Sequence, residues 1–193
     1  GVRNRVPEEV QLRLMFEYYR PQKLGVLNDP GELNSALNTE SLRAISQELS
    51  FELVEELYTP DSDGKVDVSQ IPEALARLKE QGAEAIYVGS SSFNLENQVA
   101  FVEAAAALNL PVFSAYTQMV RDGGALMAVG TNYGNVGRLA AVQAEQIILN
   151  GVGAGTLPVK SLNRYSVILN MKSAKNLEIY PPLSLLAVAE IVQ

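Results

Sequence analysis

The sequence contains no cysteine and no histidine in its 193 residues. The absence of cysteine excludes disulfides, thiolate metal ligands and cysteine nucleophiles. The absence of histidine removes the usual general base near neutral pH and the commonest protein ligand of transition metals. An enzyme built on this chain would have to work with carboxylates, lysine, tyrosine or serine.

Long hydrophobic runs and an excess of positive charge are also missing. No apolar run approaches the roughly 18 residues that a membrane-spanning helix needs. Lysine and arginine total 15 against 22 aspartates and glutamates, and this net charge of −7 disfavours contact with nucleic acid or anionic membranes. No signal peptide is visible in the opening GVRNRVPEE, so either the protein is cytosolic or an export signal has been removed.

Helical and extended patterns alternate along the chain. Short apolar runs predict strands at 23–27, 51–58, 85–88, 111–115, 126–129 and 165–169. Helical patterns occupy 7–19, 33–49, a segment capped by Ser69 and ended by Gly82, 94–108, 136–149 and 182–192. This alternation implies βαβ units, and hence an α/β fold with a Rossmann-like parallel sheet flanked by helices.

Two glycine-containing motifs favour structural interpretations. The run GVGAG at 151–155 follows a helical pattern and is soon followed by Pro158, which indicates a helix stop and not a dinucleotide site. The run DSDG at 61–64 lacks the ligand spacing of a calcium loop, which favours a surface turn.

Polar residues follow several of the predicted strands. In an open parallel sheet, ligands bind outside the carboxyl ends of the strands. Amides, hydroxyls and a phenol at these ends, with no obvious acid–base pair, favour binding over catalysis. The candidate ligand-binding residues are Glu32, Asn34, Ser35, Ser90, Ser91, Tyr116, Thr117 and Asn132, and each of them could instead be a cap or turn residue.

Four longer segments occur in a fixed order along the chain. They read NDPGELNS, AIYVGSSS, LPVFSAYTQMVRDGGALMAVGTNYGNVGR and SVILNMKSAKNLEIYPPLSLLAVAE. The ordered set resembles the ABC-transporter solute-binding proteins of the tryptophan/tyrosine type. The resemblance implies a type I periplasmic-binding fold with a ligand between two lobes, in a periplasmic or otherwise extracytoplasmic receptor that serves a membrane permease. It also implies no catalytic residue, metal, cofactor or nucleic-acid partner, and it is compatible with a lipid anchor on the full-length protein.

Members of the resembled family are longer than this chain, so the resemblance implies a fragment. Residues 1–130 would form the second lobe, 131–163 a crossover helix and loop that normally pack on a first lobe, and 164–193 a returning strand and C-terminal helix. The apolar face of the crossover helix would then be exposed, form a homodimer or dock onto this lobe. That face comprises Val136, Leu139, Val142 and Ile147.

The chain departs from the resembled family at acidic positions. Ser91 and Ser92 stand where the family often has Asp-Asn, and Tyr116 and Asn132 each replace a common aspartate. Because a ligand ammonium favours a carboxylate partner, Glu32 remains as the acidic candidate, and the ligand could be an amino acid or a neutral solute. A ligand-sensing domain of a signalling or regulatory protein with the same fold is the alternative function. A small α/β enzyme is disfavoured by the lack of histidine and cysteine.

Overall fold

The computed structural model, which describes residues 1–193, is built around a seven-stranded sheet. Neighbouring strands are parallel except for the antiparallel pair β6 and β8. This confirms the α/β class with a mostly parallel sheet. In spatial order the strands are β3 (Glu52–Leu57), β2 (Lys23–Asn28), β4 (Ala85–Val88), β5 (Val112–Ser114), β6 (Met127–Gly130), β8 (Ser166–Asn170) and β9 (Glu190–Val192).

Helices cover both faces of this sheet, as parallel crossovers require. Along β4, Ala85 and Tyr87 enter one core while Ile86 and Val88 enter the other, because successive side chains of a strand point to opposite faces. The first core also contains side chains of α1 (Glu8–Tyr18), α2 (Leu33–Leu49), α8 (Met171–Asn176) and α9 (Leu183–Leu186). The second contains side chains of α3 (Ile71–Glu80), α5 (Gln98–Ala107) and α6 (Thr117–Arg121).

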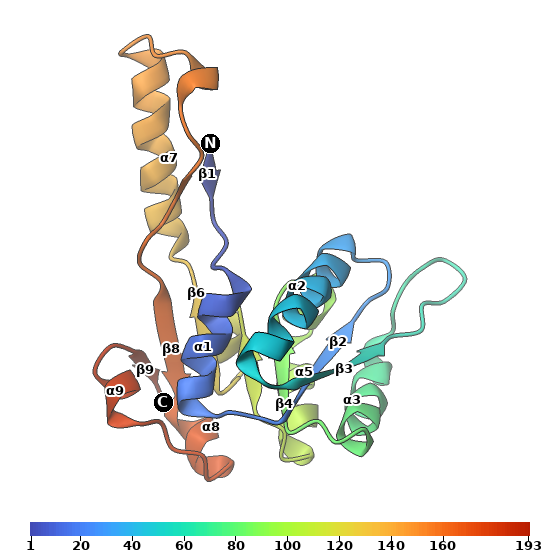
Figure 1. The fold of residues 1–193 in the computed structure, drawn as a ribbon. Coiled ribbons are helices and arrows are strands. Elements are labelled where there is room, and N and C mark those ends of the chain that lie inside the picture. Colours follow the sequence, from blue (N-terminus) through green and yellow to red (C-terminus); the bar gives the residue numbers. More distant parts are fainter.

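An arm made of α7 (Tyr133–Ile148) and a two-stranded ladder extends away from the sheet (Figure 1). The ladder pairs β1 (Val2–Arg3) in parallel with β7 (Lys160–Ser161), and a short 3₁₀ helix, Ala154–Thr156, precedes β7. Gln143 is the one buried residue of α7, while Val142 and Ile147 are 47% and 39% exposed. Two residues of the predicted apolar face, Val142 and Ile147, are therefore exposed, while Val136 and Leu139 are half-buried.

The predicted helix over 182–192 is wrong in its second half. The helix α9 ends at Leu186, and Glu190–Val192 forms β9, which pairs in parallel with β8. Without β9, the edge of β8 would leave backbone N–H and C=O groups unpaired, and this pairing satisfies them. A helical pattern within the segment cannot reveal such a contact with a distant strand.

Two other predicted helices differ in detail. The predicted helix over 94–108 is two helices, α4 (Ser92–Glu96) and α5, separated at Asn97. The predicted cap Ser69 lies inside a 3₁₀ turn, Val68–Gln70, that precedes α3. Asp67 caps this turn instead, since its carboxylate accepts a 2.8 Å hydrogen bond from the Ser69 backbone N–H.

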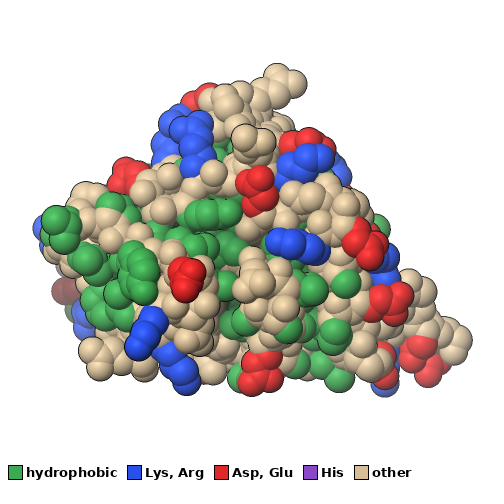
Figure 2. Space-filling view, turned by 90° about the horizontal axis from the view of Figure 1, so that it is seen from below, with side chains coloured by type: hydrophobic (Ala, Val, Ile, Leu, Met, Phe, Trp, Pro, Cys, Tyr) green, Lys and Arg blue, Asp and Glu red, His purple; other side chains and the backbone are tan.

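The end of the molecule opposite the arm carries further exposed apolar side chains. Figure 2 shows them gathered on its left, over the region of α9 and β9, among charges of both signs. They include Tyr180, Leu183, Val188 and Ile191. None of the helices combines the length and the apolar character that crossing a bilayer demands.

Candidate functional site

A cavity of about 350 Å³ lies at the carboxyl ends of β4, β5 and β6. The segment before α1, the first turns of α1 and α2, and the first residue of α7 complete its walls. This is the edge of the sheet where an open parallel fold binds ligands. Arg5 and Glu8 are the charged side chains that line it, and its other polar lining consists of amides, hydroxyls and phenols.

Four of the eight predicted site residues line this cavity. Asn34 is exposed on the first turn of α2, and Ser90 lies in the loop after β4. Tyr116 and Thr117 are half-buried where the chain passes from β5 into α6. The structure therefore brings together residues from three separate connections between a strand and the helix that follows it.

Glu32 and Ser35 face a different neighbour, the start of α4. The Glu32 carboxylate accepts hydrogen bonds of 2.8 and 3.0 Å from the backbone N–H groups of Ser92 and Phe93. Ser35, which is 1% exposed, donates a 2.8 Å hydrogen bond to the same carboxylate. Helix N-termini favour negative charge, so Glu32 ties the start of α2 to the start of α4.

Ser91 and Asn132 cap helices. The Ser91 hydroxyl, in a residue 1% exposed, accepts a 3.2 Å hydrogen bond from the Asn94 backbone N–H at the start of α4. The Asn132 side chain accepts a 3.1 Å bond from the Asn135 backbone N–H at the start of α7. Both satisfy N–H groups that a helix leaves unpaired, and neither side chain lines the cavity.

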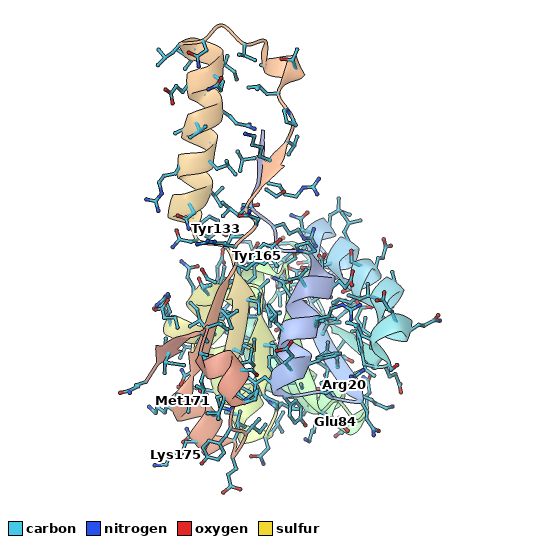
Figure 3. The ribbon with its side chains drawn as sticks, turned by 60° about the vertical axis from the view of Figure 1, so that its left-hand side comes forward. Arg20, Glu84, Tyr133, Tyr165, Met171 and Lys175 are labelled. Atoms are coloured by element: carbon cyan, nitrogen blue, oxygen red, sulfur yellow. The ribbon has the colours of Figure 1, made fainter.

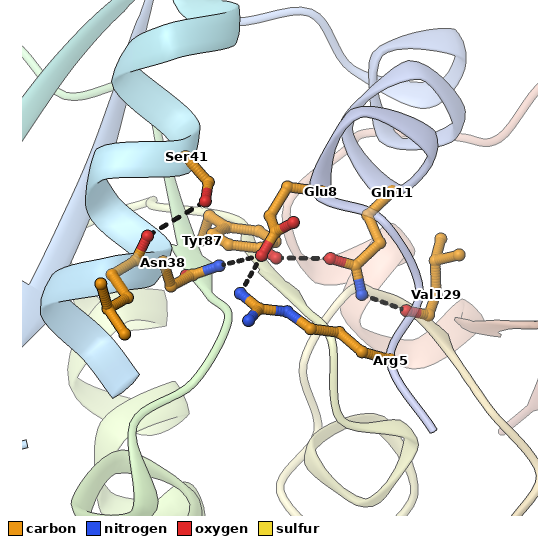
Figure 4. A network of polar contacts seen from close by, with 8 residues as sticks. Arg5, Glu8, Gln11, Asn38, Ser41, Tyr87 and Val129 are labelled. Carbon is orange, nitrogen blue, oxygen red and sulfur yellow. Dashed lines mark hydrogen bonds and ion pairs between the residues drawn. The ribbon is translucent and has the colours of Figure 1, made fainter. Parts of the chain in front are cut away.

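The structure adds a polar network on the cavity wall that the sequence did not predict (Figure 4). The Glu8 carboxylate accepts hydrogen bonds through Oε1 from the Arg5 guanidinium and, at 2.9 Å, from the Asn38 side chain. Arg5 lies in the segment that joins β1 to α1, Glu8 opens α1, and Asn38 lies on α2. The network therefore joins these three parts of the chain beside the cavity.

A second chain of hydrogen bonds runs beneath the first. The buried Tyr87 phenol donates a 2.6 Å hydrogen bond to Gln11 Oε1, and Gln11 Nε2 donates a 2.8 Å bond to the Val129 carbonyl. Burial raises the pKa of Tyr87 far above its ordinary value, and the Glu8 charge adds to this effect. Tyr87 is therefore a neutral hydrogen-bond donor at physiological pH.

Gly89 makes room for this arrangement. A Cβ atom at residue 89 would lie 2.0 Å from Asn38 Oδ1 and 2.6 Å from the Tyr87 ring. Real atoms do not approach so closely, so any larger residue would displace Asn38 or Tyr87.

Two phenols line the outer part of the cavity. Burial raises the pKa of Tyr116, with smaller contributions from the charges of Glu32 and Tyr133. Tyr133 is 64% exposed and lies at the base of α7, near the place where Tyr165 leads into β8 (Figure 3). The two rings supply apolar faces beside the polar lining, a combination suited to a ligand with an apolar body and a polar head.

A second, wider depression lies on the other side of Glu32. It is open to solvent and carries carboxylates from Asp29, Glu32, Asp67 and Glu96 together with Lys65. Its acidic side chains make it the less suitable of the two for a ligand that carries both charges.

Two of three similar proteins are described by an aromatic amino acid. A tyrosine-binding protein of Clostridioides difficile (strain R20291) is 24% identical over 159 residues, which are 82% of this chain and 43% of that protein. A conserved domain protein of Vibrio cholerae superposes with a TM-score of 0.81 at 25% identity, over all of this chain and 62% of that one. An ABC domain of Streptococcus pneumonia in complex with L-Trp gives 0.78 at 21% identity, over all of this chain and 64% of that one. The chain thus spans less than two thirds of these relatives.

Less similar solved structures identify the type of fold. An arabinose binding protein and a periplasmic ribose transporter protein superpose with TM-scores of 0.57 and 0.60, and the fold is that of type I periplasmic binding proteins. The family profile described as "ABC transporter substrate binding protein" matches residues 1–193. The chain therefore belongs to the family of ABC transporter substrate binding proteins.

Proposed function

We propose that this chain is the solute-binding part of an extracytoplasmic ABC importer component, and that its cavity binds an amino acid or a similar small polar solute. The observation that carries the proposal is the cavity at the ends of β4, β5 and β6, which combines one arginine, one glutamate, neutral hydrogen-bonding groups and three phenols. These groups can orient a ligand that has a charged head and an apolar side chain.

The lining side chains have distinct proposed roles. Asn34, Ser90 and Thr117 donate and accept hydrogen bonds, and Tyr116 supplies a stacking face. Four other side chains support the lining residues without contacting the ligand. Their hydrogen bonds hold the loops that carry the lining, and they belong to Glu32, Ser35, Ser91 and Asn132.

The arm is the proposed connection to a first lobe. We propose that residues 1–130 form one lobe, that 131–163 pack on a first lobe, and that 164–193 return to this one. The exposed apolar side chains of α7 and its extension from the sheet support this division (Figure 1). Closure of two lobes over the solute would signal its presence to a membrane permease, and a lipid anchor would hold the full-length protein at the membrane.

The amino-acid class has support from the relatives that are named for tyrosine or solved with L-Trp. A ligand that binds the folded state stabilises it by mass action. We expect L-tyrosine or L-tryptophan to raise the Tm of the protein in a screen that includes the other amino acids and several sugars. A screen in which sugars stabilise the protein and no amino acid does would contradict the amino-acid assignment.

A further inference from the structure

We infer that the Arg5–Glu8 ion pair recognises the zwitterionic head group of the ligand, with its ammonium on Glu8 Oε2 and its carboxylate on the guanidinium N–H groups of Arg5. This inference rests on the proposed function and names the residues that would select the ligand. Glu8 thereby takes the role that the sequence suggested for Glu32, whose carboxylate is occupied by α4.

The ion pair retains unused hydrogen-bonding capacity. Both hydrogen bonds to the Glu8 carboxylate use Oε1, and Oε2 has no partner within the chain. Arg5 donates through one terminal nitrogen, while a guanidinium carries five N–H donors. The Arg5 side chain is 47% exposed, so its remaining donors are accessible from the cavity that it lines.

The carboxylate is held in place before a ligand arrives. Glu8 belongs to the first turn of α1, and its side chain is 15% exposed. Asn38, which is 5% exposed, fixes the carboxylate from α2, and Gly89 leaves the space that Asn38 occupies. A fixed partner loses little conformational freedom on binding, which favours affinity and selectivity.

The pairing of opposite charges favours a zwitterion over a ligand with one charge. An amino acid can place its own two charges beside the ion pair, so that each meets an opposite charge. An amine without a carboxylate would gain Glu8 but would lie beside the positive guanidinium, and a carboxylic acid without an amine would lie beside the negative carboxylate. The amine leaves the Arg5 guanidinium without a negative partner on the ligand, and the carboxylic acid leaves the Glu8 carboxylate without a positive one.

The test measures the dissociation constants of three related probes by isothermal titration calorimetry. The probes are L-tyrosine, tyramine, which lacks the carboxylate, and 3-(4-hydroxyphenyl)propanoate, which lacks the ammonium. Glu8→Gln should weaken L-tyrosine and tyramine about 10- to 100-fold and should not weaken the propanoate. Arg5→Gln should weaken L-tyrosine and the propanoate by a similar factor and should not weaken tyramine.

Matched controls come from the same helix. Arg13 and Glu9 form an exposed ion pair of 2.9 Å on α1, away from the cavity lining. Glu9→Gln and Arg13→Gln make the same charge changes and should leave all three dissociation constants within about twofold. Thermal unfolding of each variant shows whether it folds, and because the Arg5 side chain is 47% exposed, Arg5→Gln keeps the inference testable if Glu8→Gln does not fold.

The results distinguish a failure of the ion-pair role from a failure of the proposed function. If L-tyrosine binds and neither Glu8→Gln nor Arg5→Gln weakens it more than the controls do, the role of the ion pair is wrong and the proposed function stands. If the wild-type protein binds no amino acid at all, the proposed function fails and the inference fails with it.

Discussion

The phenol of Tyr87 on β4 donates a 2.6 Å hydrogen bond to the side-chain oxygen of Gln11 on α1, which is 3% exposed. Gln11 in turn donates a 2.8 Å bond to the Val129 carbonyl on β6. These two buried bonds in the cavity wall join three elements that are distant in sequence. The position of α1, and with it that of Glu8, depends on this connection.

Tyr87→Phe should destabilise the fold. It leaves Gln11 Oε1 buried without a donor, which costs about 1–3 kcal/mol in unfolding free energy. Urea unfolding measures the loss. Tyr180→Phe is the matched control, because Tyr180 is 63% exposed and makes no side-chain hydrogen bond. Equal stabilities for the two variants would show that the buried bond contributes nothing.

Gly89→Ala should weaken ligand binding. Its Cβ would lie 2.0 Å from Asn38 Oδ1, so Asn38 must move and the hydrogen bond from Asn38 to Glu8 is lost. We expect the dissociation constant for L-tyrosine to rise about tenfold in calorimetry.

The control for this variant is Gly137→Ala, where a new Cβ on α7 meets no atom within 4 Å. Alanine in a helix interior stabilises by about 0.5–1 kcal/mol over glycine, so this variant should bind normally and unfold at higher urea. Normal binding by Gly89→Ala would show that the hydrogen bond from Asn38 to Glu8 does not matter for ligand binding.

Glu32→Ala should reduce stability and should lower the affinity for L-tyrosine much less than Glu8→Gln does. It removes the hydrogen bonds from Ser92, Phe93 and Ser35, at a cost of about 1–3 kcal/mol. Glu96→Ala, an exposed carboxylate on α4, is the control for charge. A large loss of L-tyrosine affinity at full stability would instead assign Glu32 to the ligand ammonium.

Alkaline pH should destabilise the protein. Burial raises the pKa of Tyr58 far above the value of about 10 that a tyrosine has in an unfolded chain, and the charges of Asp29 and Glu32 add to the shift. The folded state then holds the proton more tightly than the unfolded state does. Its stabilisation is complete below pH about 10 and is lost as the pH rises further, by at most about 1.4 kcal/mol per pH unit for one group.

Urea unfolding at several pH values from about 8 to about 11 checks this dependence. Tyr58→Phe should flatten the decline, because phenylalanine has no proton to lose. It also removes the 2.8 Å hydrogen bond to Asn94, so its stability should be lower at neutral pH. If the free energy of unfolding of the wild-type protein stays constant up to pH about 11, the Tyr58 phenol is not buried as the structure has it.

The sheet was predictable because its central strands are continuous apolar runs. All four residues of β4, AIYV, are buried, as is typical of a strand covered on both faces. The strand β9 was not predictable in this way, since its conformation depends on pairing with β8 some twenty residues earlier. The ladder of β1 and β7 joins residues still further apart, Val2 and Lys160.

The cavity lining was predictable from the sequence where it follows strands, and it was not predicted at the start of α1. Tyr116 and Ser90 each lie two residues after the end of a strand, β5 and β4 respectively, where ligands bind in an open parallel sheet. Arg5 and Glu8 belong to a polar segment that gave no strand-end signal. A usable signal was Gln11, since it shares the buried face of α1 with Leu12, Met15 and Tyr18, and a buried amide requires partners.

The most direct measurement of the central claim is a ¹H–¹⁵N correlation spectrum of the protein titrated with L-tyrosine. We expect saturable shifts in the amides of the cavity, including Gly89, Ser90, Tyr116 and Thr117, and in the Arg5 side chain. Amides around the wider depression at Lys65 and Asp67 should not move. A spectrum that stays unchanged, or one whose shifts gather at that depression, would contradict the assignment of this cavity as the solute site.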